Sequence, residues 1–325
     1  MKNHLDFEKP ILELQKTLDE LKKNPQAHTL GMNFEDEIKQ FEKKLAEKRK
    51  EVFSNLTAWQ RVQLARHPRR PFTLDYLRTT FSDFNELHGD RMYAEDRAVV
   101  GGFAKLGDEK VMVIGTQKGR DTKENILRNF GSAHPEGYRK ALRLMKMADK
   151  FGLPIITLID TAGAFPGVAA EERHIAEAIA VNLREMMLLD VPTIAVVIGE
   201  GGSGGALGIG VADRVLILEN SYYSVISPEG CAAILWKDRT AAAKAAEALK
   251  ITAGKLAELR LVDEVVPEPL GGAHNDPKTT AATLKKILMA QLADLQKMSS
   301  AERLKKRYDR FRAHGHFTEK QTAAA

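Results

Sequence analysis

The sequence PTIAVVIGEGGSGGALGIGVADRVLIL, residues 192–218, predicts how the centre of this chain folds. Residues 193–198 form a continuous, β-branched apolar run that is too short for a helix, which is typical of a strand buried on both faces. Residues 206–212 predict one or two tightly packed helical turns. Between them lie glycines that allow close approach to the backbone and permit positive φ angles: Gly199, Gly201, Gly202, Gly204 and Gly205. N–H groups at a helix start have no partner within the helix, so we expect this turn to bind an anion or a developing oxyanion.

The middle of the chain repeats this order of strand, glycine-containing turn and helix. We expect strands at 98–105, 110–116 and 154–159, and helices at 137–151 and 169–189. Such units imply parallel strands joined by right-handed crossovers, with the turns gathered at the carboxyl ends of the strands. Ligands bind at that edge of such sheets, so the turns at 160–167 and 199–206 should face one cleft.

Both ends of the chain differ from this α/β region. Residues 1–70 are charged and poor in glycine, and their apolar residues recur at helical spacing: Ile11, Leu14, Leu18, Leu21, Phe34, Ile38, Phe41 and Leu45. This predicts a helical hairpin as an N-terminal arm over 1–70, with the boundary at Pro71 and an α/β domain over 71–325. We expect 74–87 and 279–312 each to form one helix, and the tail from about residue 314 to be disordered.

Composition excludes several classes of protein and of site. The chain has 325 residues and one cysteine, Cys231, which cannot build a disulfide framework or a cysteine-ligated zinc site and fits a reducing cytoplasm. The N-terminus lacks the apolar core of a signal peptide, and no stretch approaches the ~20 apolar residues of a membrane span. Lysine and arginine outnumber aspartate and glutamate by 49 − 44 = 5, which fits either a solvated surface or a polyanionic ligand.

A polar segment at 117–136 follows the second predicted strand and carries several cations. Lys118 and Arg120 flank Gly119, and further basic side chains follow: Lys123, Arg128, His134 and Arg139. Cations on a glycine-containing loop after a strand can hold phosphate groups. An exposed loop without a ligand explains the same residues equally well, so both interpretations stay open.

The chain has no Walker phosphate loop, because no lysine and hydroxyl residue follow the glycine cluster, and no dinucleotide fingerprint. Residues 201–205 do match the Gly-x-Ser-x-Gly elbow of a serine hydrolase, with Ser203 as the nucleophile. Such a serine needs an acid and then a histidine further along the chain, where the only histidines are His274, His314 and His316. We therefore favour a turn in which Ser203 is a spacer and backbone N–H groups stabilise an oxyanion: those of Gly204, Gly205 and Ala206.

A resemblance to a known family runs from about residue 34 to 312 and rests on eight long motifs. They are ELHGDR at 86–91, GTQKGRDTKENILRNFG at 115–131, PEGYRKALRLM at 135–145, IDTAGAFPG at 159–167, AEERHIAEAIAVNLREM at 170–186, GEGGSGGALGIGVADRV at 199–215, YSVISPEGCAAILW at 223–236 and PEPLGGAH at 267–274. In these motifs the sequence resembles the alpha subunits of bacterial acetyl-coenzyme A carboxylase carboxyltransferases.

The resemblance implies a crotonase-like fold, an α/β superhelix of ββα units, with an N-terminal helical hairpin and a C-terminal helix. It implies transfer of a carboxyl group from carboxybiotin on a carrier protein to acetyl-CoA, giving malonyl-CoA at the first committed step of fatty acid synthesis. In this family two backbone oxyanion holes hold the enolates, and one maps here onto Gly204, Gly205 and Ala206. The candidate substrate-binding residues lie in the two glycine turns and the basic segment: Gly163, Ala164, Phe165, Gly167, Gly201, Gly202, Lys118 and Arg120.

The resemblance also implies that the chain is catalytically incomplete alone. A zinc-containing beta subunit would supply the second oxyanion hole in an α2β2 heterotetramer, alongside a biotin carboxyl carrier protein and biotin carboxylase. We expect no covalently bound cofactor, metal or membrane contact in this chain. The sequence departs from the family at His174 and Ile175, where relatives carry a Gly–Gln pair. A basic module that binds nucleic acid is a third hypothesis, and such binding should be weak and non-specific.

Overall fold

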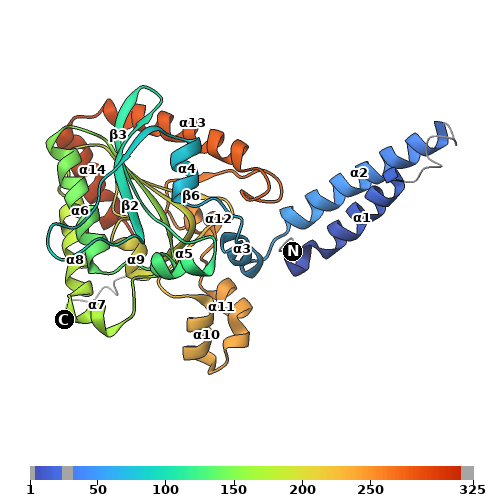
Figure 1. Cartoon of the computed structure of the whole chain (residues 1–325), viewed down its shortest axis with the longest axis horizontal. Coiled ribbons are helices and arrows are strands. Elements are labelled where there is room, and N and C mark those ends of the chain that lie inside the picture. Colours follow the sequence, from blue (N-terminus) through green and yellow to red (C-terminus); the bar gives the residue numbers. More distant parts are fainter. Residues whose placement is uncertain (1–3, 24–31, 316–325) are drawn as a thin grey trace, which may run out of the picture.

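The computed structural model describes residues 4–23 and 32–315 of the chain. Figure 1 shows a mixed α/β body from which a helical hairpin projects at one side. The hairpin consists of α1 (Lys9–Lys23) and α2 (Met32–Ser54), as the apolar spacing predicts. Its small core contains the buried Ile11, Leu18 and Leu45, while the side chain of Phe34 lies outside the described part. The predicted arm is therefore a hairpin with a core of its own.

One eight-stranded sheet forms the centre of the body. Its strands are β1 (Ser82–Glu86), β2 (Val99–Leu106), β3 (Glu109–Thr116), β4 (Ile155–Thr161), β5 (Thr193–Gly202), β6 (Arg214–Leu218), β7 (Tyr222–Ser224) and β8 (Glu264–Val266). The order is β1-β2-β3-β4-β5-β6-β8, with β7 paired to the end of β5. The pairs from β3 to β8 are parallel, and β1–β2 and β2–β3 are antiparallel. The predicted parallel region is confirmed, and its carboxyl ends lie along one edge.

Helices cover both faces of the sheet, which explains why the central strands are continuous apolar runs. In β5, Ala195 and Val197 face a core formed with α6 (Pro135–Lys150) and α8 (Ile175–Met186). The alternating residues Ile194 and Val196 face a second core with α4 (Thr73–Thr79) and α13 (Pro277–Gln296). Successive side chains of a strand point to opposite faces, so both sets must be apolar.

The remaining helices are short, except the C-terminal one. They are α3 (Ala58–Ala65), α5 (Thr122–Leu127), α7 (Val168–Glu172), α9 (Ser203–Leu207), α10 (Pro228–Trp236), α11 (Ala242–Ala248), α12 (Ala253–Glu258) and α14 (Ser300–Arg312). Figure 1 shows α5, α7 and α9 at the same end of the body. The tail predicted to be disordered falls almost entirely on residues 316–325, outside the described part.

The prediction of one helix over 74–87 is wrong in its second half. The helix α4 ends at Thr79, and β1 then pairs antiparallel with β2, with Glu86 opposite Gly102. A Cβ atom at Gly102 would overlap the carbonyl of Asn85, so this glycine lets β1 lie close to β2. Pairing with a distant strand overrides the local helical spacing here.

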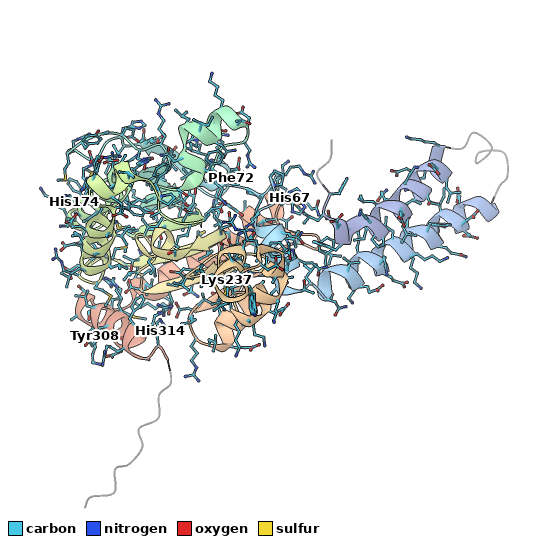
Figure 2. The ribbon with its side chains drawn as sticks, turned by 90° about the horizontal axis from the view of Figure 1, so that it is seen from below. His67, Phe72, His174, Lys237, Tyr308 and His314 are labelled. Carbon is cyan, nitrogen blue, oxygen red and sulfur yellow. The ribbon has the colours of Figure 1, made fainter. Side chains whose placement is uncertain are left out.

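Two longer predicted helices are each divided in the structure. The segment 169–189 forms α7 and α8, which separate at His174, a residue with a positive φ of 64°. Figure 2 shows His174 on the side of the body away from the hairpin. The segment 279–312 forms α13 and α14, and the Ser299 hydroxyl caps the second by accepting a hydrogen bond from the Glu302 N–H. A capping serine starts a new helix by satisfying an otherwise free N–H group.

Candidate functional site

The glycine-rich segment is built differently from the sequence prediction. The strand β5 continues through Gly202, and α9 begins directly at Ser203, so Gly199, Gly201 and Gly202 are extended strand residues. None of the five glycines has a positive φ, whereas Ser203 does, at 48°. A non-glycine residue in this region is strained and is often found at functional sites. Gly199, Gly201, Gly202 and Gly205 therefore serve close packing rather than a left-handed turn.

This packing brings the two predicted turns into direct contact. A Cβ atom at Gly202 would overlap the carbonyl of Ala162, and one at Gly205 would overlap the backbone of Gly163. The Thr161 hydroxyl holds the second turn in shape, accepting from the Gly163 N–H at 3.1 Å and donating to the Gly163 carbonyl at 2.8 Å. The two turns therefore lie side by side, while a cleft that both of them face stays a prediction, because only the turn at 199–206 lines the adjoining cavity.

The N-terminus of α9 leaves its first backbone N–H groups without a helical acceptor. In an α-helix beginning at Ser203, the first N–H group that can bond within the helix belongs to Ala206. The N–H groups of Gly204 and Gly205 precede it, so neither has an acceptor four residues earlier within this helix. Gly204 is half-buried and Gly205 is buried, so these donors lie at a partly enclosed position. The arrangement can stabilise a negative charge on an oxygen atom.

A cavity of about 500 Å³ adjoins this helix start. Ser203, Gly204 and Leu207 form one side, and the rest is mainly apolar and comes from β7, α12 and α14. The phenol of Tyr223 also lines it, and burial raises the pKa of this phenol to about 12. The cavity is therefore suited to a largely apolar group beside the two backbone donors.

The turn after β4, residues 161–167, packs against the start of α9 but does not line this cavity. The ring of Phe165 stacks on His134 with a centroid distance of 4.0 Å, and its backbone N–H donates to the Ala133 carbonyl. A Cβ atom at Gly167 would overlap the same Phe165 ring, so glycine is needed where α7 starts. Gly163, Ala164, Phe165 and Gly167 are all half-buried beside α9. The structure thus brings the predicted turn residues together.

The two predicted phosphate-binding cations have intramolecular partners. The Lys118 ammonium donates to Asp160 Oδ1 and Glu200 Oε2, both at 2.6 Å. The Arg120 guanidinium donates to the carbonyls of Pro68 and Arg70, pairs with Asp75 and stacks over the Phe72 ring at 3.9 Å. These contacts fix the 117–136 segment to the body, where it forms α5 rather than an open loop. A phosphate-binding role for these two residues stays a prediction that this geometry does not support.

An ionic network behind the glycine turn was missed by the sequence analysis. Glu200 accepts from Lys118, from Arg66 Nε at 2.7 Å and from the Tyr222 hydroxyl at 2.6 Å. Arg66 also pairs with Glu229 at 2.5 Å. Burial opposes ionisation of Glu200, but the charges of Lys118 and Arg66 outweigh it and lower the pKa of Glu200 to about 2. Glu200 is therefore ionised at neutral pH, and in the sequence it stood out only as one letter of the motif at 199–215.

The serine elbow lacks its partners in the described residues. His274 stacks on His67 at 3.8 Å near the junction with the hairpin, where Figure 2 labels His67. His314 lines the same cavity as Ser203, but no hydrogen bond joins their side chains, and His316 lies outside the described part. No group of three or more histidine, cysteine or acidic side chains able to hold a metal ion occurs within residues 4–23 and 32–315.

Comparisons of the sequence with known proteins agree on one family. A family model described as acetyl co-enzyme A carboxylase carboxyltransferase-like matches residues 4–315. An acetyl-coenzyme A carboxylase carboxyl transferase subunit alpha of Erwinia tasmaniensis is 59% identical over 315 residues, which cover 97% of this chain and 99% of the relative. A protein of the same name from Escherichia coli is 57% identical with the same coverage.

Solved structures with low identity share the fold. Transcarboxylase 12S aligns with a TM-score of 0.56 and 18% identity over 77% of this chain and 43% of its own, so this chain spans less than half of that protein. A Pseudomonas malonate decarboxylase hetero-tetramer in complex with coenzyme A aligns with a TM-score of 0.56 and 16% identity over 67% and 88%. These similarities confirm the crotonase-like fold. Among the described helices, none is long and apolar enough to cross a membrane.

Proposed function

We propose a mechanism for this chain from the premise that it belongs to the family of acetyl-coenzyme A carboxylase carboxyl transferase alpha subunits. As a member of that family it is a carboxyltransferase that acts on a coenzyme A thioester together with a second subunit. The proposed reaction moves the carboxyl group of carboxybiotin, carried on a partner protein, to the methyl carbon of acetyl-CoA. The observation that supports it most directly is the start of α9, where the N–H groups of Gly204 and Gly205 precede the first helical hydrogen bond and Gly205 packs on the β4 turn.

The chemistry requires donors for transient oxygen anions. The N–CO₂ bond of carboxybiotin breaks to give CO₂ and the biotin enolate, which removes a proton from the acetyl methyl group. The resulting thioester enolate then attacks CO₂, forming the new C–C bond of malonyl-CoA. We propose that the N–H groups of Gly204 and Gly205 stabilise the biotin enolate oxygen, while Ala206 stays a predicted third contributor. Removing one such donor costs roughly 3–4 kcal/mol of transition-state stabilisation in well-studied enzymes.

The other predicted glycine-turn residues would shape the site rather than react. Gly201 and Gly202 keep β5 close to its neighbours, and we propose that Gly163, Ala164, Phe165 and Gly167 contact the substrate beside the start of α9. The mainly apolar cavity beside Ser203 would hold the uncharged part of a substrate. This division needs no side-chain nucleophile, and it agrees with the position of His274, which stacks on His67 and does not line the cavity beside Ser203.

Exposed apolar side chains around the site support a partner that covers it. Ile126, Phe130, Val168 and Val225 are each 60–76% exposed, on the segments that flank α9. Isolated exposed apolar residues are common, but several around one candidate site are typical of an interface. We propose a zinc-containing beta subunit here, in an α2β2 assembly that the biotin carboxyl carrier protein and biotin carboxylase serve. The cytoplasmic location and weak binding to nucleic acid stay predictions.

Reconstitution tests this proposal. The purified chain is mixed with its beta subunit, and malonyl-CoA-dependent carboxylation of free biotin is followed. We expect activity from the mixture that exceeds the sum of the two separate chains. No gain on mixing, although the two chains form a complex, would contradict the proposal.

The variant Ser203→Ala tests the serine hydrolase alternative in the same assay. We expect carboxyl transfer within about threefold of the wild type, because the backbone donors remain. Loss of activity in a variant that folds and assembles normally would instead support Ser203 as a nucleophile.

A further inference from the structure

The pairing of β4 with β5 is interrupted just before the catalytic turn. The strands pair regularly up to Ile159 and Val197, and the next pair is Thr161 with Gly201. Between these pairs β4 has one residue, Asp160, while β5 has three, 198–200. Extra residues on one strand form a bulge, which bends that strand and leaves ladder groups unpaired. The bulge therefore sets the direction in which β5 enters α9.

The Asp160 carboxylate fills the gap that the bulge leaves. Its Oδ1 atom accepts the backbone N–H of Glu200 at 2.9 Å, in place of a carbonyl from the neighbouring strand. The backbone N–H of Asp160 donates in turn to the Thr116 hydroxyl at 2.6 Å. A Cβ atom at Gly199 would lie 2.5 Å from Oδ1, so glycine at that position makes room for the carboxylate. The irregular backbone is thus held by a side chain.

Lys118 ties the two acidic residues of this bulge together. Its ammonium lies 2.6 Å from Asp160 Oδ1 and 2.6 Å from Glu200 Oε2, and the side chains of Asp160 and Glu200 are 0% and 8% exposed. Without this cation, the buried Asp160 would lose its salt bridge beside the charged Glu200, which would still pair with Arg66, and breaking a buried pair is unfavourable. Burial opposes the charge of Lys118, but the two carboxylates outweigh it and raise the pKa of its ammonium group. Lys118, which the sequence predicted as a phosphate-binding residue, therefore makes its ion pairs within the protein.

Glu200 is separated from the predicted oxyanion donors by only a few residues of backbone, so fixing the position of Glu200 restricts theirs. Gly202 follows two residues later and packs on the Ala162 carbonyl, and Gly204 and Gly205 come next. An oxyanion donor must sit within about 0.5 Å of its productive position to act fully. We propose that Asp160 and Lys118 are positioning residues, which fix the bulge at Glu200 and thereby aim the N–H groups of Gly204 and Gly205. This inference rests on the carboxyltransfer function proposed above.

The variants Asp160→Ala and Asp160→Asn test the inference with the full chain in complex with its beta subunit. Alanine removes the acceptor for the Glu200 N–H, and we expect kcat to fall at least tenfold while KM for malonyl-CoA changes less than twofold. Asparagine keeps an oxygen at Oδ1, and its amide nitrogen replaces Oδ2, which has no partner among the described residues. We therefore expect asparagine to restore kcat to within about threefold of the wild type.

Amide hydrogen exchange of the segment 199–206 measures how firmly this backbone is held, independently of catalytic activity. We expect faster exchange there in Asp160→Ala and in Lys118→Met, with Asp160→Asn close to the wild type. The control is Asp213→Asn, which alters another buried aspartate, one that pairs with Arg307 at 2.8 Å near the start of β6. This control should change neither the exchange of 199–206 nor kcat.

Distinct outcomes separate this inference from the proposed function. An unchanged kcat in Asp160→Ala, equal losses in Asp160→Asn and Asp160→Ala, or unchanged exchange at 199–206 would each overturn the positioning role. If Asp160→Ala does not fold, Lys118→Met supplies the same two measurements. An inactive wild-type complex would instead contradict the carboxyltransfer function, and the exchange results would still decide whether Asp160 and Lys118 hold the turn.

Discussion

At the scale of single residues, His174 combines a left-handed backbone with an exposed side chain. Its φ is 64°, and no side-chain hydrogen bond from it caps α8. This conformation costs a non-glycine residue about 1–2 kcal/mol. Replacement by glycine removes that cost, but part of the gain is lost because glycine has more conformational freedom in the unfolded chain. We expect His174→Gly to raise the free energy of unfolding by about 0.5–1 kcal/mol, measured by urea denaturation. His174→Ala keeps the strain and should give no gain, and an equal gain from both variants would contradict this explanation.

His274 makes the stability of the protein depend on pH. Burial, together with the nearby His67, Arg69 and Arg70, lowers the pKa of His274 to about 3, from about 6.5 in an unfolded chain. Below pH 6.5, His274 therefore binds a proton in the unfolded state but not in the folded state, so the free energy of unfolding falls as the pH falls. Between pH 6.5 and 4.5 we expect this residue to cost about 2 kcal/mol of unfolding free energy.

The variant His274→Phe measures that contribution. Phenylalanine keeps a ring stacked on His67 and cannot titrate, and the buried Nδ1 atom of His274 has no hydrogen-bond partner to lose. Urea denaturation at pH 6.5, 5.5 and 4.5 should show a flatter pH dependence in the variant. Glu200 interferes little, because its lowered pKa removes stability only as the pH falls below about 4.5 toward 2. Parallel curves for the two proteins would show that His274 titrates normally.

Residue identity predicted the backbone donors but not the ionic network behind them. Glycines followed by a helix start are adjacent in sequence, so Gly204 and Gly205 could be found from local pattern alone. The partners of Glu200 are 82 residues away at Lys118 and 134 residues away at Arg66. No local spacing connects them, and only the parallel crossovers bring them together. The same lack of context made Lys118 look like a phosphate ligand.

At the scale of elements, the close contact between the β4 turn and α9 predicts contrasting effects of two neighbouring glycines. A methyl group at Gly205 would overlap the Gly163 backbone, whereas at Gly204 its nearest atom, Ile179 Cδ1, is 3.5 Å away. We expect Gly205→Ala to lower kcat at least 100-fold by separating the two turns, and Gly204→Ala to lower it less than tenfold. Steady-state kinetics of the reconstituted complex provides the measurement.

Gly254 on α12 supplies the matched control for these variants. No atom lies within 4 Å of the position of a Cβ there, so Gly254→Ala should leave kcat unchanged. If Gly205→Ala were as active as Gly254→Ala, the two turns would not need to touch for catalysis.

The sequence predicted the helices and strands correctly where burial determines the pattern of apolar residues. It predicted them less well where contacts with distant residues determine the structure. The strands β3 to β6 are apolar on both faces, and that pattern exists only in a covered sheet. The edge strand β1 has mainly exposed side chains, so its sequence carries no such pattern, and it forms because Gly102 admits it beside β2. The break between α13 and α14 depends on one capping serine, which helical spacing does not reveal.

At the scale of the whole molecule, the residues just before the boundary predicted at residue 70 pack on the body. The helix α3 buries Ala58, Val62 and Ala65 against Tyr222, Ala246 and Ile251 of the body. After it, Arg66 pairs with Glu200, and the fully buried Arg70 pairs with Glu268 at 2.5 Å and donates to the Ile198 carbonyl. These contacts make 58–70 part of the body, so we propose that the arm ends near residues 55–57.

Truncation distinguishes the two boundaries. Deleting residues 1–55 removes a hairpin whose apolar residues bury one another, so we expect the remaining chain to unfold cooperatively within a few degrees of the full chain. Deleting 1–70 leaves Glu200 without Arg66 and Glu268 without Arg70, and breaking one buried pair costs about 3–5 kcal/mol. Two such losses approach the total stability of a typical domain, so this fragment should not fold. Thermal unfolding followed by circular dichroism makes the comparison, and a cooperative transition in the fragment 71–325 would place the boundary at residue 70 after all.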